Sequence, residues 1–272
     1  MATTALLPAL VADAIRDALD VTLPSALRVP WHGATMEERA ILLERGWQEA
    51  EEYEIGTRDA LHPFVRDAFH LLARPEVSVE LVVGDVQAKR DHTAFAATDG
   101  GFALMARYDE RGLMLEAVRP TGLAPALVGL LPPHPPGRGQ SASVRTATLR
   151  AVTDRVGRQP AAMERELAAA GVRRADAEVI AAVLTAERVR GGQLCAIGYE
   201  QHGGKGHVVD LEVGFIDTEQ GRYLTQNKPG EPADQATTAD DGDRNHLTIA
   251  PADNARLVER IDEMITRAYA LR

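Results

Sequence analysis

The expected order of helices and strands repeats along this chain, and the repeat constrains the fold more than any single motif. Residue periodicities predict a helix, a run of short strands and a closing helix between about residues 62 and 131. The same order recurs between about residues 176 and 271. Two similar halves, 1–136 and 137–272, favour one wide sheet that both halves share, with helices packed against it.

The first half contains clear start and stop signals for its elements. Thr35 to Glu38 reproduces a capping box, which predicts a helix from about residue 35 to 53. A second helix begins at Pro63 and ends before Pro75. An alternating strand follows from Val77, and turns rich in Asp and Gly separate three more strands that favour antiparallel hairpins. These strands are expected at His92–Thr98, Phe102–Tyr108 and Leu113–Val118.

A segment rich in Pro, Gly and Ser, from Pro132 to Ser143, is the best linker candidate between the halves. Beyond it, an amphipathic helix around Val183 is expected to end at Gly191-Gly192, and the last helix opens at Pro251. The strands between these helices are expected at Gln193–Tyr199, His207–Asp217, Arg222–Gln226 and His246–Ile249.

Composition excludes several classes of protein. Hydrophobic residues make up 45% of the 272 positions, which is enough for a large core. The formal net charge of -10 argues against nucleic acid or an anionic membrane as the main partner, because both require clustered cations. No apolar run approaches the roughly 20 residues that span a bilayer. With one cysteine, Cys195, and an acidic N-terminal stretch unlike a signal peptide, we expect a soluble cytoplasmic protein.

Motifs that would carry chemistry fail on inspection. The loop around Gly203-Gly204-Lys205 resembles a phosphate loop, but a strand follows it, and no Ser or Thr follows the Lys. Asp240 to Asp243 lacks the ligand spacing of a calcium loop. No histidine is placed as a base for a nucleophile. We therefore expect no catalytic residue, no metal and no cofactor, and we expect both tryptophans, Trp31 and Trp47, in the core.

An ordered series of short motifs runs almost from end to end of the chain. Each motif is a cap, a turn or a strand end with its own structural reason, so their order and spacing carry the identification. They are Leu23-Pro24, Gly33-Ala34-Thr35 with Glu38-Arg39, Leu72 to Pro75, Leu130-Leu131-Pro132, Gly137 to Val144, Gly171-Val172, Arg190 to Gln193, Asp217-Thr218, Gly221 to Leu224 and Ala250 to Asp253. In this order the motifs resemble the EspG family, the cytosolic chaperones associated with ESX (type VII) secretion systems.

This resemblance implies a quasi-twofold α+β fold with a central, mainly antiparallel sheet and flanking helical bundles. It also implies a protein without enzymatic activity or cofactor, whose partner is a PPE-like protein of a PE–PPE heterodimer. Such a chaperone covers the tip of the PPE protein until secretion. Covering an apolar tip removes its surface from water and so suppresses self-association of the substrate.

Strand alternation alone places some polar side chains where they could line a partner surface, although it equally suits ordinary solvent-facing residues. These candidates are Gln193, Asp210, Glu212 and Arg222. Three other functions stay open: an adaptor for another helical secretion substrate, a structural protein that forms a homodimer through its sheet edge, and an enzyme that uses the loop around Lys205.

The sequence predicts that the purified protein binds neither nucleotide nor metal. Calorimetric titration with ATP, zinc and calcium should give no stoichiometric response in the micromolar range. A clear response to any of the three ligands would contradict the interpretation as a protein without enzymatic activity.

Overall fold

One sheet runs through the whole molecule. The computed structural model describes residues 4–86, 90–200, 205–209, 212–228 and 245–271. Its 11 strands lie in the order β1-β5-β4-β3-β2-β7-β9-β10-β11-β6, with β8 pairing to β7 beside this path. Neighbouring strands are antiparallel throughout the described ladders. The predicted α+β class with a mainly antiparallel sheet is confirmed.

The elements follow one another in two similar series. The first comprises β1 (Thr4–Leu7), α1 (Ala9–Ala18), the short helix η1 (Ser25–Leu27), α2 (Met36–Glu52), α3 (Pro63–Ala73), β2 (Val77–Asp85), β3 (Arg90–Thr98), β4 (Ala103–Asp109), β5 (Gly112–Val118), η2 (Pro120–Gly122) and α4 (Leu123–Gly129). The second comprises β6 (Ala142–Arg145), α5 (Thr146–Val156), α6 (Pro160–Ala169), α7 (Arg174–Thr185), β7 (Arg188–Tyr199), β8 (Gly206–Val208), β9 (Glu212–Thr218), β10 (Gly221–Lys228), β11 (His246–Pro251) and α8 (Asn254–Ala270).

The repeat is longer than the sequence indicates, because each series also begins with a short strand and two further helices. The early strands occupy matching places, since β1 pairs with β5 and β6 pairs with β11 at the two ends of the sheet. Thr98 and Thr218, both fully buried at the ends of β3 and β9, show the same equivalence. Each hydroxyl accepts a hydrogen bond from the N–H two residues on (3.0 and 3.1 Å) and donates one to a carbonyl of the same turn (2.9 and 3.1 Å).

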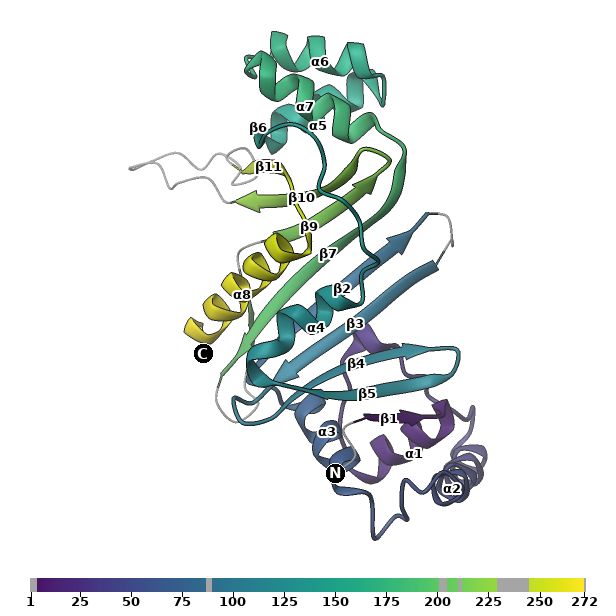
Figure 1. Ribbon diagram of the computed structural model, residues 1–272. Helices are drawn as coiled ribbons and strands as arrows, with labels where there is room; N and C mark the ends of the chain where they lie inside the picture. The colour runs from purple at the N-terminus through teal and green to yellow at the C-terminus, as the bar shows by residue number, and fades with distance from the viewer. Residues whose placement is uncertain (1–3, 87–89, 201–204, 210–211, 229–244, 272) are drawn as a thin grey trace.

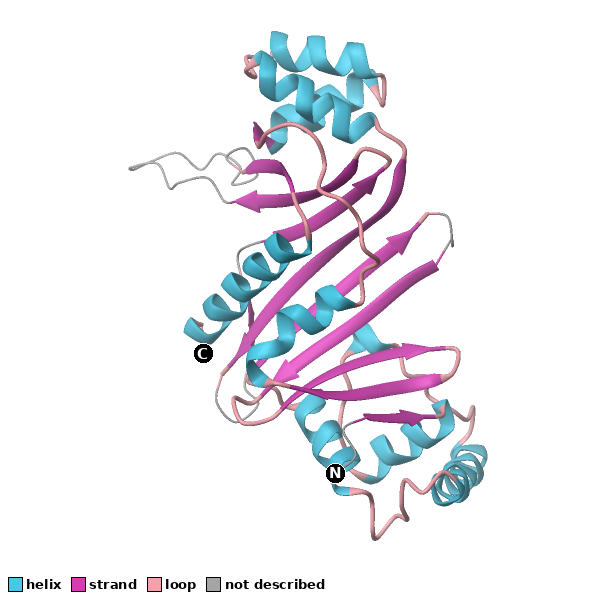
Figure 2. Cartoon of the chain, viewed as in Figure 1, coloured by secondary structure: helices cyan, strands magenta, loops and turns pink. Residues whose placement is uncertain are grey.

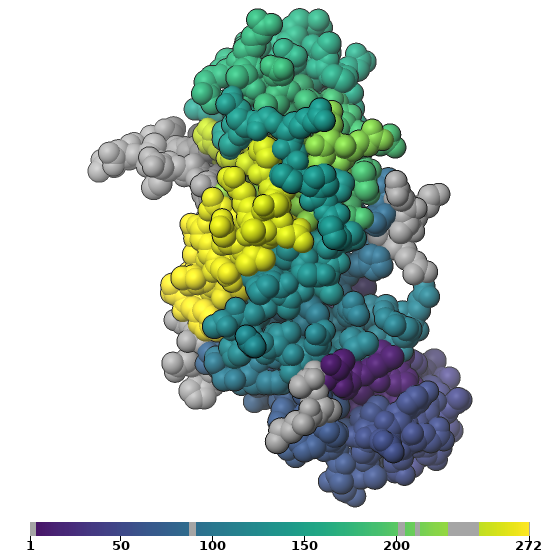
Figure 3. Space-filling model, viewed as in Figure 1, coloured from purple at the N-terminus to yellow at the C-terminus, as the bar shows by residue number. Residues whose placement is uncertain are grey.

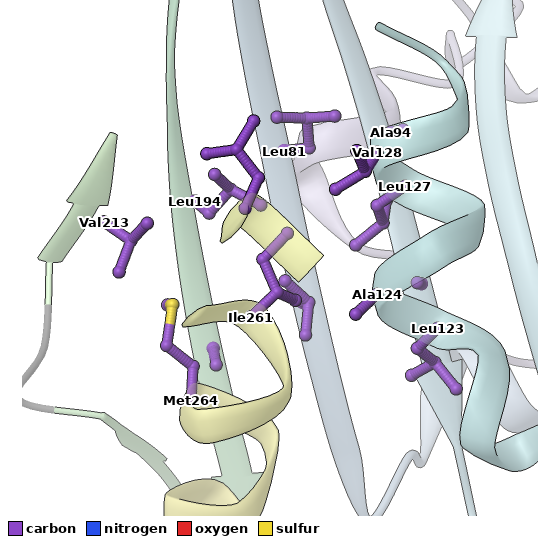
Figure 4. Close-up of a cluster of buried hydrophobic side chains, with 14 of the residues drawn as sticks. Leu81, Ala94, Leu123, Ala124, Leu127, Val128, Leu194, Val213, Ile261 and Met264 are labelled. Atoms are coloured by element: carbon purple, nitrogen blue, oxygen red, sulfur yellow. The ribbon is translucent and has the colours of Figure 1, made fainter. Parts of the chain in front are cut away.

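Helices α4 and α8 lie next to each other on one face of the sheet (Figures 1 and 2). Together with the linker after α4 they cover the middle of this face in the space-filling view (Figure 3). Between them and the sheet, Leu81 of β2 and Leu194 of β7 pack with Leu127 of α4 and with Ile261 and Met264 of α8 (Figure 4). Because both halves contribute strands and a helix to this cluster, it joins the halves into one core.

The other six long helices pack on the opposite face, toward the two ends of the sheet. Phe95 and Leu104 belong to the cluster under α1–α3, whereas their neighbours Ala94 and Ala103 belong to the cluster under α4 and α8. In the second half, Tyr223 faces α5–α7 while Leu224 faces α8. Successive residues of a strand point to opposite faces, so both bundles lie opposite α4 and α8. Among the described residues, those of the middle strands β2, β7 and β9 are absent from the cores of both bundles.

Three expectations about the elements and the core are wrong. Gly191-Gly192 does not end a helix, because α7 stops at Thr185 and Gly191 pairs with Gly84 inside the β2–β7 ladder. The strand expected at His207–Asp217 is two strands, β8 and β9. Trp47 is buried as expected, but Trp31 is 64% exposed and lies with its ring over the guanidinium of Arg39. That contact gives the ring a cation–π partner in place of a core position.

A buried carboxylate holds the N-terminal helices together. Asp13 of α1 is fully buried and accepts hydrogen bonds from the backbone N–H of His32 (2.8 Å) and from Arg39 of α2 (3.2 Å), and it pairs with Arg16. Arg39 also bonds Asp17 at 2.7 Å. Burial alone would raise the pKa of Asp13, but the hydrogen bonds from His32 and Arg39 lower it below its usual 3.8. The ionised form is therefore the one that the fold stabilises.

We predict that this carboxylate contributes to the acid sensitivity of the protein. A folded-state pKa below the unfolded value adds stability above the ordinary pKa near 3.8, and this stability is lost as pH falls through the folded-state pKa. Asp13→Asn should cost about 3 kcal/mol at neutral pH, because Arg16 and Arg39 lose a buried partner. Its urea-unfolding stability should then fall less steeply below pH 4 than that of the parent. Equal slopes for the two proteins would contradict this assignment.

Candidate partner-binding groove

A groove crosses the face of the sheet opposite α4 and α8. It lies between the helical bundles α1–α3 and α5–α7. Two hollows, of about 420 and 560 Å³, form it. Both are lined by Val82 of β2, Gln193 of β7 and Thr225 of β10, so they are continuous. Because the floor is made of strands from both halves, the groove depends on the sheet being shared.

Small residues on the floor of the groove leave the space above it free. At Gly214 of β9, a Cβ atom would lie 2.7 Å from the Thr225 hydroxyl and 2.9 Å from the Gly192 carbonyl, so a larger residue cannot sit there without a shift. Thr146, at the start of α5, forms part of the wall and donates a hydrogen bond to the Asn227 side chain at 3.3 Å. The C-terminal bundle is thus anchored directly to the strand that borders the groove.

Apolar side chains border this groove and face solvent. Val82, Val86 and Val208 line the two hollows and are 37%, 55% and 60% exposed. Glu80 and Cys195 lie half-buried on the floor beside Val82. A concave surface with exposed apolar residues and a few polar groups between them is typical of a site for another protein.

The structure separates the four residues that the sequence offered as partner contacts. Gln193 is exposed on the floor of the groove. Asp210 lies outside the described residues, and Glu212 lies in β9, but its side chain is also outside the described part. Arg222 is fully buried on the opposite face of the sheet, which contradicts its expected place at a partner surface.

Arg222 is the centre of a buried ion-pair cluster. Its guanidinium donates two hydrogen bonds to the carboxylate of Asp217, at 2.7 and 2.8 Å, and also contacts the side chain of Asn254 at the start of α8. A further bond at 3.1 Å reaches the Pro132 carbonyl in the linker. Arg190 of β7 bonds the same Asp217 at 2.9 Å. Arg222 therefore connects a strand hairpin, the linker and the last helix.

Sequence reasoning missed Glu80, Val82, Cys195 and Thr225 as groove residues. The alternation in β2 does place Glu80 between the buried residues Val79 and Leu81, so it could have indicated an outward side chain. It could not indicate which outward positions the helical bundles would cover. That depends on where α1–α3 and α5–α7 pack, which no local pattern in the strands records.

Within the described residues, no group of three or more His, Cys, Asp or Glu side chains is arranged to hold a metal ion. No helix in this part of the chain combines the length and apolar character needed to cross a bilayer. The fold and groove therefore define a binding protein built on one sheet, with a bundle of helices at each end and an open floor between them.

The sequence matches the EspG family over residues 8–263, and the chain belongs to that family. The family is one of chaperones and not of enzymes, which confirms the expected absence of an enzymatic activity. The fold is similar to the structure of the Mycobacterium tuberculosis type VII secretion system chaperone EspG5, solved in complex with a PE25–PPE41 dimer. The TM-score is 0.74 at 13% sequence identity, covering 98% of this chain and 96% of that one. No curated protein sequence matches at a significant level.

Because Arg222 is buried and donates two hydrogen bonds to Asp217, we predict that its loss destabilises the fold and does not act selectively on binding. Arg222→Ala should lower the free energy of unfolding by about 3–5 kcal/mol, since Asp217 would keep only Arg190 in a buried site. Urea denaturation measures this change. Arg188→Ala, at an exposed position of β7, is the control and should stay within about 0.5 kcal/mol of the parent.

Proposed function

We propose that this protein is a cytoplasmic chaperone of a type VII secretion system that binds the tip of a PE–PPE dimer in the groove. The observation that carries this proposal is the open strip of sheet between the two bundles, with its three exposed valines. Support comes from membership of the EspG family and from the similar fold of EspG5, which was solved with such a dimer.

The chemistry of the groove suits a partner that must later be released. Exposed apolar side chains supply the attraction, because covering them removes apolar surface from water. Polar residues interrupt them, namely Glu80, Gln193 and Thr225. An interface of this mixed composition resembles the non-obligate complexes of proteins that also exist apart. A chaperone that hands a secretion substrate on to other machinery requires an interface of this kind.

The first test is co-expression of this chain with each PE–PPE pair encoded in the same genome, followed by affinity purification. At least one pair should co-purify in a stable 1:1 complex with the chain. If every pair is soluble and none is retained, the proposal is wrong. A partner retained without any PE–PPE pair would instead favour an adaptor for another secretion substrate.

The chain provides its own reporter for the site of binding, because Cys195 is its single cysteine and lies half-buried on the groove floor. A bound tip should slow the alkylation of Cys195 by a maleimide by about tenfold or more, since the reagent must then wait for dissociation. The matched control is the Cys195→Ser, Glu116→Cys variant. Its thiol would lie at an exposed position of β5 outside the groove, and its alkylation rate should not change when the partner binds. Equal rates for Cys195 with and without partner would place the binding site elsewhere.

A further inference from the structure

The groove floor is centred on the local twofold relation between the halves. Nine residue pairs join β2 to β7, from Val77 with Gly198 to Asp85 with Arg190, and the central pair is Leu81 with Leu194. Both central leucines are buried in the core under α4 and α8. The residues on either side of this central pair in each strand face the groove, and the twofold rotation exchanges them between the two strands.

Four side chains occupy these flanking positions. Glu80 lies opposite Cys195 in the ladder, and Val82 lies opposite Gln193. A rotation that exchanges Leu81 with Leu194 brings Glu80 onto Gln193 and Val82 onto Cys195. Val82 and Cys195 are both small and apolar in character. Glu80 and Gln193 are nearly the same size and differ in charge, so the floor is symmetric in shape and asymmetric in charge.

The carboxylate of Glu80 is available for a partner. Its side chain is half-buried and forms no hydrogen bond or ion pair with any residue that the structure describes. The acidic residue Asp91 and the exposed cation Arg188 both border the larger of the two hollows. A partner that covered Glu80 without supplying a cation would leave a carboxylate buried and unpaired, which is strongly unfavourable.

We propose that Glu80 is a specificity-determining residue of the groove, selecting a partner tip that carries a Lys or Arg beside its apolar side chains. This inference rests on the proposed function and names the chemistry that the partner must have. Because the carboxylate lies on one side of the twofold axis only, it also distinguishes the two orientations in which an elongated tip could lie on the floor. Rejection of tips without a cation is then as important as attraction of the correct one.

The test uses the PE–PPE pair that co-purifies with the parent chain, titrated at 50 and 300 mM salt. Glu80→Gln keeps the shape of the side chain and removes its charge, so we expect affinity to fall about tenfold or more and its salt dependence to weaken. Glu116→Gln removes the same charge at an exposed position of β5 outside the groove and should change affinity less than twofold. The melting temperature of both variants should stay within a few degrees of the parent.

A second variant separates the position of the charge from its presence. The double substitution Glu80→Gln, Gln193→Glu moves the carboxylate across the twofold axis, and it should bind as weakly as Glu80→Gln alone. Full affinity in the double variant would overturn the role in orientation. Unchanged affinity and salt dependence in Glu80→Gln, with a pair that the parent retains, would overturn the inference and leave the proposed function intact. If the parent retains no pair, both fail.

Discussion

The antiparallel ladder between β2 and β7 is the interaction on which the rest of the molecule depends, because it makes one sheet out of two similar halves. Nine residue pairs form it, and its central leucines, Leu81 and Leu194, lie in the core that α4 and α8 cover. The reverse side of the same two strands is the floor of the groove. Core and groove are therefore on the two faces of one strand pair, and residues that alternate along each strand face one or the other.

Buried ion pairs connect several elements of the structure in addition to apolar packing. Asp85 and Asp217 balance Arg190 and Arg222 in a cluster that links β2, β7, the β9–β10 hairpin and the start of α8. Buried ion pairs of this kind gain little over apolar residues of equal size, but losing one member leaves a charge uncompensated. Asp217-Thr218 and Gly221-Arg222 are among the motifs that mark the family resemblance, and their role here is structural.

Local patterns in the sequence were sufficient to predict most of the fold. Thr35 caps the N–H of Glu38 as expected, although the Glu38 carboxylate bonds the N–H of Ala34, one residue before the cap. The strands between residues 90 and 118 lie within two residues of their predicted bounds. The early strands β1 and β6 were missed because four residues carry too little periodicity to be recognised before their partners are known. Arg222 was misplaced for a related reason: alternation gives the face of a strand that a side chain occupies, but not whether a helix and a linker cover that face.

The location of the groove follows from the duplication itself. Each half packs a helical bundle near its own end of the sheet, so the strands at the junction are the ones left without a bundle on that face. A site on the local twofold axis has equivalent positions on its two sides. A substitution at one outward position alters the site and leaves the core residues unchanged. Glu80 and Gln193 differ in this way, while Leu81 and Leu194 next to them remain alike. In this chain, the outward residues of β2 and β7 can therefore change without a change in the leucines of the core.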